Sequence, residues 1–197
     1  MTAAGTMPAP PKARFEGAAA LRLAERLRER LAPCCERVEI AGSLRRGRPT
    51  VGDIELLYIP RFDSVRYDLF SLRVINLVDE GPLAELLRGG ELAKRPNSRG
   101  AETWGERNKL ARHVLSGTPL DLFATCEACW HNYLVCRTGP AALNVEIAQR
   151  ARARGHKWNP YGPGFTRLAD QSIVRMASER EVFEFVGLPW REPSERG

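Results

Sequence analysis

The stretch GSLRRGRPTVGDIE, residues 42–55, combines a glycine turn, two arginines and two carboxylates within one short segment. The apolar run over residues 53–59 predicts a strand, and side chains alternate between the two faces of a strand. Asp53 and Glu55 therefore project to the same side, about 7 Å apart along the backbone. Ile54, which lies between them, projects to the opposite side and into a core.

This pair of carboxylates has two possible explanations. Neighbouring carboxylates repel each other unless they are protonated, hydrogen-bonded or bridged by cations, and oxygen ligands at this spacing suit Mg²⁺ shared with a substrate phosphate. A half-buried strand with a polar outer face is the better explanation of the Asp-x-Glu pair when the pair is taken alone. The segment before it favours a phosphate site, because a glycine turn at Gly42 exposes backbone N–H groups and arginine forks pair with phosphate oxygens.

A third carboxylate, Asp121, lies in the apolar sequence PLDLF, residues 119–123. An acid in the middle of a core strand is costly unless it has a partner. Asp121 is therefore expected to be either ion-paired or a metal ligand.

The spacing of apolar residues predicts an α+β chain with two lobes. Residues 1–13 are rich in alanine and proline and predict a flexible tail, residues 14–125 form the first lobe, and residues 126–197 form the second. The predicted elements are a helix over 15–31, strands over 38–41, 53–59, 110–115 and 120–125, helical structure over 65–88 with a break at Gly81-Pro82, a helix ending near Gly155, and a helix from the capping box Ser178–Glu181 to Gly187.

Composition limits the possible partners. Thirty Lys plus Arg against 24 Asp plus Glu give a formal net charge of +6, which favours polyanionic partners such as nucleic acid or nucleotides. A solvated basic face without a partner explains the same excess. The sequence lacks an apolar run of the roughly 18 residues that a membrane helix needs, so we expect a monomeric cytoplasmic protein without a membrane partner.

The five cysteines are odd in number and irregular in spacing, which suits reduced thiols better than a disulfide framework. Cys126-x-x-Cys129, followed by His131 and Cys136, contains elements of a zinc site. A second matched pair of ligands is missing from the sequence, so buried thiols are the preferred interpretation.

Four motifs in the same order resemble the X-family DNA polymerases, the family of DNA polymerase beta. The pattern GSxRRGx₄GDIE over residues 42–55 resembles their nucleotidyltransferase signature, and LDLF at 120–123 is similar to their third-carboxylate strand. RTGP at 137–140 resembles their nucleotide-binding turn. Residues 181–196 resemble their closing helix and tail. The resemblance covers about residues 36–197.

The resemblance implies a nucleotidyltransferase palm, with a mixed sheet and flanking helices, over residues 14–125. It also implies a small C-terminal α/β lobe that selects the nucleotide over residues 126–197. Two Mg²⁺ ions, which Mn²⁺ can replace, would be held by Asp53, Glu55 and Asp121. The reaction implied is transfer from a nucleoside triphosphate to the 3′ end of DNA, as in DNA repair. The residues implied to bind the nucleotide are Gly42, Ser43, Arg46, Gly52, Thr138, Gly139 and Asn144.

Several positions depart from the family pattern. Glu55 replaces the commoner aspartate, Pro119 stands where an arginine often orients the third acid, and Cys136-Arg137 replaces an aromatic pair beside the sugar. These differences favour nucleotidyl transfer in general over templated synthesis. The alternatives are a transferase that modifies a small molecule, tRNA or protein, and a non-catalytic nucleic-acid-binding module. Because the resemblance lacks the family's DNA-gripping modules, we expect a weak, salt-dependent grip on DNA.

Overall fold

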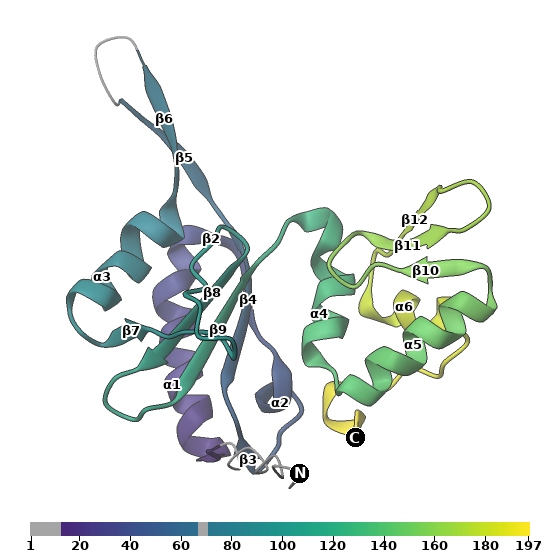
Figure 1. The fold of residues 1–197 in the computed structure, drawn as a ribbon, viewed down its shortest axis with the longest axis horizontal. Helices are drawn as coiled ribbons and strands as arrows, with labels where there is room; N and C mark the ends of the chain where they lie inside the picture. Colours follow the sequence, from purple (N-terminus) through teal and green to yellow (C-terminus); the bar gives the residue numbers. More distant parts are fainter. Residues whose placement is uncertain (1–12, 67–70) are drawn as a thin grey trace, which may run out of the picture.

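The structure is a computed structural model that describes residues 13–66 and 71–197, so the predicted tail lies almost entirely outside the described residues. Two lobes stand side by side (Figure 1). The first lobe runs to residue 124, and the second begins with the helix α4 (Trp130–Thr138). No described helix has the length and apolar character needed to cross a membrane.

A five-stranded mixed sheet forms the centre of the first lobe. Its strands, in spatial order, are β2 (Cys35–Ile40), β4 (Ile54–Pro60), β9 (Pro119–Ala124), β8 (Asn108–His113) and β7 (Leu92–Lys94). β4 and β9 are parallel, whereas the other neighbours are antiparallel. The strands predicted around residues 38, 53, 110 and 120 are therefore confirmed, including the antiparallel pair joined by a turn at Gly117.

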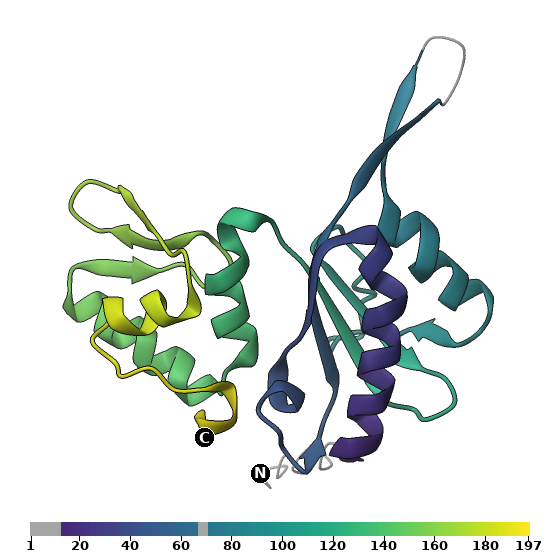
Figure 2. The ribbon, with the colours of Figure 1, turned by 180° about the vertical axis from the view of Figure 1, so that it is seen from behind.

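Helix α1 (Gly17–Leu31) covers one face of this sheet (Figure 2). Its buried face carries Leu23, Leu27 and Leu31, as the apolar spacing predicts, and these residues share a core with Ile54. The helix begins two residues later than expected, because residues 15–16 form a short strand, β1 (Phe15–Glu16), that pairs with β3 (Thr50–Val51).

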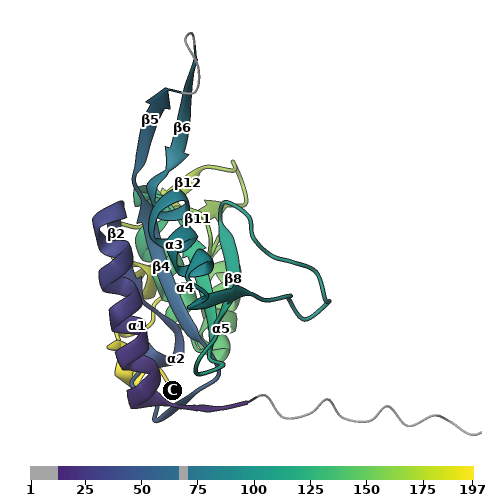
Figure 3. The same cartoon turned by 90° about the vertical axis from the view of Figure 1, so that its left-hand side faces the viewer.

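The prediction of helix over residues 65–88 is wrong for its first part. The chain instead forms an antiparallel ribbon of β5 (Phe62–Arg66) and β6 (Leu72–Asn76), which extends beyond the body of the lobe (Figures 1 and 3). Residues 67–70 lie outside the described residues. Helical structure begins only at residue 77 and continues through η2 (Asp79–Leu83) and α3 (Ala84–Arg88), and the predicted break at Gly81 is confirmed by its non-helical backbone.

The second lobe packs helices against a small sheet. The elements after α4 are α5 (Ala141–Ala153), β10 (His156–Trp158), β11 (Gly164–Arg167), β12 (Ile173–Arg175) and α6 (Glu179–Phe185). Leu143, Ile147 and Ala151 form the buried face of α5, as predicted. The capping box is also confirmed, because Ser178 Oγ accepts a hydrogen bond from the Glu181 N–H at 3.1 Å.

Helix α4 covers the sheet face opposite to α1. Leu57 of β4 and Phe123 of β9 share a core with Trp130, Tyr133 and Leu134 of α4. Because side chains alternate along a strand, Glu55 and Asp121 project to this same face. The predicted acids therefore lie on the side of the sheet that faces the second lobe.

Candidate active site

The pairing of β4 with β9 brings two predicted acids together. Glu55 and Asp121 are direct partners in the parallel register, although 66 positions separate them in the sequence. Asp53 precedes β4 by one residue and is half-buried. Strand pairing thus gathers the three acids that the sequence singled out at one end of the sheet.

The group formed by Asp53, Glu55 and Asp121, which we call the acid corner, is governed by burial and by repulsion between like charges. Burial, and next the charge of Asp53, raise the pKa of Glu55 to about 8. Burial also raises the pKa of Asp121, although the adjacent Arg95 opposes the shift. The corner therefore favours a bound proton or an additional cation.

The donor chemistry of the corner fits divalent cations such as Mg²⁺, which prefer carboxylate oxygens. Over the described ranges, however, no three His, Cys, Asp or Glu side chains converge into a ready metal-ligand set. Two of the acids instead face arginines: Asp121 is ion-paired with Arg95, and a nitrogen of Arg137 lies 3.9 Å from Glu55. Residues 53, 55 and 121 thus supply suitable donors whose oxygens are partly engaged by guanidinium groups.

The glycine turn lies directly against Glu55. Gly42 opens the four-residue helix α2 (Gly42–Arg45) with φ of +63°, and a Cβ placed there would stand 2.1 Å from Oε2 of Glu55. The positive φ therefore favours glycine at this position, and a larger residue would in addition displace the Glu55 carboxylate. Ser43 follows it and is half-buried, whereas a Cβ placed at Gly52, at the other end of the motif, would stand 3.9 Å from a guanidinium nitrogen of Arg14.

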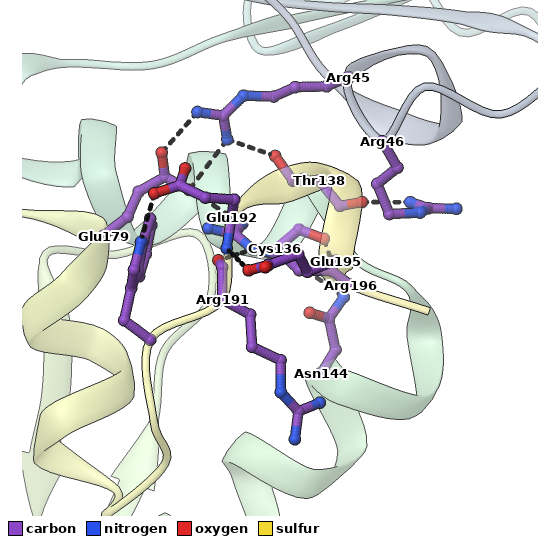
Figure 4. A network of polar contacts seen from close by, with 11 residues as sticks. Arg45, Arg46, Cys136, Thr138, Asn144, Glu179, Arg191, Glu192, Glu195 and Arg196 are labelled. Carbon is purple, nitrogen blue, oxygen red and sulfur yellow. Dashed lines mark hydrogen bonds and ion pairs between the residues drawn. The ribbon is translucent and has the colours of Figure 1, made fainter.

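Arg46 connects the turn to the second lobe (Figure 4). Its guanidinium donates to the backbone carbonyl of Thr138, the last residue of α4. The Nε of Arg46 is buried without a partner. Burial, and next the charge of Arg48, lower the pKa of Arg46. Arg46, Thr138 and the adjacent Gly139 are therefore close together.

Asn144 lies one turn into α5, on the side of Cys136. Its Nδ2 donates to the backbone carbonyl of Cys136 at 2.8 Å, while its Oδ1 is buried without a partner. Figure 4 shows Asn144 apart from Arg46, on the far side of the chain end. Among the predicted nucleotide-binding residues, Thr138 and Gly139 thus lie against Arg46, and Asn144 is held by the Cys136 carbonyl beside Gly139.

An ion-pair network that the sequence did not reveal links the two lobes. Arg45 donates to both oxygens of Glu179, at 2.9 and 2.6 Å, and to the hydroxyl of Thr138 at 2.8 Å. Arg196 donates to Glu179 from the other side at 3.0 Å (Figure 4). Although burial opposes it, the pKa of Glu179 is lowered by its two arginine partners. The sequence signal at Glu179 was only that of an acid in the first turn of a helix.

The sequence did not single out Arg95, and it placed Arg137 beside the sugar without indicating its neighbours. Arg95 follows β7 and donates its Nε to the carbonyl of Ala111 at 3.1 Å, which aims its guanidinium at Asp121. The guanidinium carbon of Arg137 lies 3.5 Å from the ring centroid of Phe123. Neither contact is visible in the sequence, because both depend on which strands and helices become neighbours.

A cleft of about 880 Å³ lies beside this site, between the β5–β6 ribbon and α4. Arg137 and Tyr133 line it, together with Cys126 and Cys129. None of the three acids contributes to its lining. The cleft therefore adjoins the acid corner through Arg137 and is separate from the carboxylates themselves.

Comparisons with known proteins identify this architecture. A solved structure of Leishmania infantum polymerase beta, in a ternary P/T complex, matches with a TM-score of 0.70 over 94% of this chain and 77% of that chain, at 17% sequence identity. A family model described as DNA polymerase beta thumb matches residues 133–197. The mixed sheet, its flanking helices and the C-terminal thumb lobe therefore define a fold of the DNA polymerase beta kind.

Two sequence relatives extend this result. The chain is 24% identical over 170 residues to DNA polymerase lambda of Arabidopsis thaliana, a match that covers 79% of this chain and 31% of the relative. It is 25% identical over 167 residues to DNA polymerase lambda of Rattus norvegicus, covering 79% and 28%. The chain thus spans less than a third of these relatives. Its sequence is similar to those of the X-family DNA polymerases of the beta and lambda kind, and residues 133–197 match the beta-type thumb.

Proposed function

We propose that this chain transfers a nucleotidyl group from a nucleoside triphosphate to a hydroxyl acceptor, and that the acceptor is the 3′ end of DNA. The observation that carries the proposal is the direct pairing of Glu55 with Asp121, beside a glycine turn that contacts Glu55. Homology to DNA polymerase lambda supports the reaction class. The ternary P/T complex of the structural relative supports DNA as the acceptor.

Asp53, Glu55 and Asp121 would hold two divalent cations, Mg²⁺ or Mn²⁺. Such ions lower the pKa of an attacking hydroxyl and stabilise the charge on the leaving pyrophosphate. Asp121, the acid on the central strand β9, is assigned to accept the hydroxyl proton. Its ion pair with Arg95 fixes the orientation of the carboxylate.

The phosphates are assigned to the turn at Gly42 and to Arg46. Arg46 keeps a buried Nε without a partner, and an arginine fork of this kind binds a phosphate oxygen strongly. Thr138 and Gly139, which lie against Arg46, are assigned to the sugar. Asn144, with its orphaned Oδ1, is assigned to the base edge.

A transfer assay tests this proposal. Purified protein is incubated with Mg²⁺ or Mn²⁺, labelled nucleotides, and either a primed template, a single strand or no nucleic acid. Asp53→Asn and Asp121→Asn should each lower transfer by at least about a hundredfold, because each removes several kcal/mol of transition-state stabilisation. Asp63→Asn, on the exposed ribbon, is the matched control and should retain normal transfer.

The arms of this assay separate the acceptors. Extension of a primed template in its complementary order supports a DNA polymerase. Labelling without added nucleic acid indicates a protein or small-molecule acceptor instead, and labelling of added tRNA in a further arm indicates that substrate. Full transfer by Asp121→Asn protein would overturn the assignment of the third acid.

A second candidate is a nucleic-acid-binding module without catalysis. The observation that favours it is that Arg95 and Arg137 already face Asp121 and Glu55. This candidate predicts salt-dependent DNA binding, transfer in no arm of the assay, and no effect of Mg²⁺ on thermal stability. The catalytic proposal predicts stabilisation by Mg²⁺ in the unmodified protein, with a smaller gain in Asp53→Asn.

A further inference from the structure

Two cysteines lie close together in the segment that joins the lobes. Cys126 and Cys129 follow the end of β9 and immediately precede α4, and their sulfur atoms are 3.5 Å apart. The N–H of Cys129 donates to the carbonyl of Cys126 at 3.0 Å, which closes a single turn, η3 (Glu127–Cys129). The backbone therefore holds the two side chains on the same side of the turn.

This geometry is compatible with a disulfide. Bonded cysteines need side chains that point toward each other, and the Cys126 and Cys129 sulfur atoms meet this condition because they lie 3.5 Å apart across a single turn. The sulfur atoms need to approach by about 1.5 Å to reach the bonded distance of about 2 Å. Side-chain rotation can supply that movement without displacement of β9 or α4.

The two thiols differ in access. Cys126 is exposed, whereas Cys129 is half-buried. Burial, and next the neighbouring Cys126, raise the pKa of Cys129 to about 11, while Arg107 and Arg175 oppose the shift. An incoming oxidant therefore meets Cys126 first, and Cys129 is the thiol placed to react second.

The other three cysteines lie elsewhere. All five cysteines fall within the described residues, and Cys126 alone among them is exposed. Burial raises the pKa of Cys35 to about 12 and that of Cys136 to about 11. Burial therefore makes Cys35 and Cys136 less accessible to an incoming oxidant than the exposed Cys126.

We propose that Cys126 and Cys129 form a reversible disulfide by exchange with a low-molecular-weight disulfide such as oxidised glutathione. The Cys126 thiolate attacks one glutathione sulfur, forms a mixed disulfide and releases the first reduced glutathione. The Cys129 thiolate then attacks the Cys126 sulfur and releases the second. Two protein thiols are oxidised, one glutathione disulfide is reduced to two thiols, and the two protons pass to the released thiolates.

The position of the pair gives the crosslink a structural consequence. It would fix the turn between β9, which carries Asp121, and α4, which ends at Thr138 against Arg46. Cys126 and Cys129 also line the cleft of about 880 Å³. The disulfide would therefore stiffen the connection between the two lobes and alter one wall of the cleft. This inference does not depend on nucleotidyl transfer.

The test uses the full chain, reduced, freed of reductant and incubated with glutathione at several ratios of oxidised to reduced form. Remaining thiols are alkylated, and intact masses and peptide maps are recorded. The wild type should lose two alkylatable thiols, at residues 126 and 129, without gaining a glutathione. Cys129→Ser should retain one glutathione on Cys126, because the second thiol is missing. Cys34→Ser, a half-buried cysteine of the first lobe, is the matched control and should oxidise like the wild type.

Hydrogen exchange supplies a structural measurement. Oxidation should slow exchange of the Cys129 amide and the first turn of α4, and should leave α1 unchanged. Three outcomes would overturn the proposal: a wild-type protein that keeps all five thiols, one that accumulates a stable glutathione adduct, or one that forms intermolecular dimers in place of the internal bond.

Discussion

The ion pair between Arg95 and Asp121 offers the sharpest test of how the acid corner is stabilised. Exposed ion pairs contribute about 0–1 kcal/mol, and removing one partner of a fully buried pair costs about 3–5 kcal/mol. The two side chains are 26% and 17% exposed, which places this pair between those limits. We therefore expect Arg95→Met to lower the free energy of unfolding by about 2 kcal/mol at about pH 8.

The effect should depend on pH. Asp121 has a raised pKa, and Arg95 counteracts that rise, so the variant should have a higher pKa still. When the pKa of a carboxyl is higher in the folded than in the unfolded state, the free energy of unfolding falls as pH rises between the two values. The difference between Arg95→Met and wild type should consequently be smaller at about pH 5, where the variant's Asp121 can take up a proton.

Urea denaturation at both pH values measures this difference. For a slope of about 2 kcal/mol per M, the expected loss at the higher pH shifts the midpoint by about 1 M. A cycle with Asp121→Asn and the double variant isolates the coupling between the two side chains. Arg112→Met, on the exposed side of β8, is the matched control and should stay within about 0.5 kcal/mol of wild type. A loss equal to that of the control, or one independent of pH, would refute the reasoning.

Three further predictions concern the neighbouring contacts. Because Glu55 has a pKa of about 8, wild type should lose stability between about pH 5 and pH 8 in the absence of metal, and Glu55→Gln should flatten this dependence in urea denaturation. Gly42→Ala should lower the free energy of unfolding by about 1–2 kcal/mol more than Gly47→Ala, because both glycines have positive φ but only Gly42 lies against Glu55. Equal losses in urea denaturation would contradict this. Arg196→Met should lower the free energy of unfolding by about 2–4 kcal/mol, because it leaves the buried carboxylate of Glu179 without one of its ion-pair partners. A thermal scan that shows no loss of stability would count against that network.

The sequence by itself determined much of the local chemistry. The two-residue period of a strand placed Glu55 on one face and Ile54 on the other, and the structure confirms both positions. The positive φ at Gly42 follows from a turn that other residues rarely adopt. The Ser178 cap and the break at Gly81 were also predictable, because capping and helix breaking act over only a few residues.

The local sequence pattern did not predict the structure of the segment that extends away from the core. The ribbon of β5 and β6 has apolar residues with high exposure, including Leu72 at 70% and Val74 at 67%. Neither strand therefore shows the division into buried and solvent faces on which a sequence pattern depends. Pairing between the two strands, such as Ser64 with Val74, decides their structure, and pairing is not encoded in a single segment.

Only the tertiary structure decided the neighbours of the acids. Arg95 reaches Asp121 because β7, β8 and β9 are adjacent in one sheet, although 26 positions separate the two residues in the chain. Arg45 reaches Glu179 across 134 positions because the lobes pack together. Long-range ion pairs of this kind follow from the arrangement of elements in space, whereas the periodicity of a strand follows from covalent geometry and is already present in the sequence.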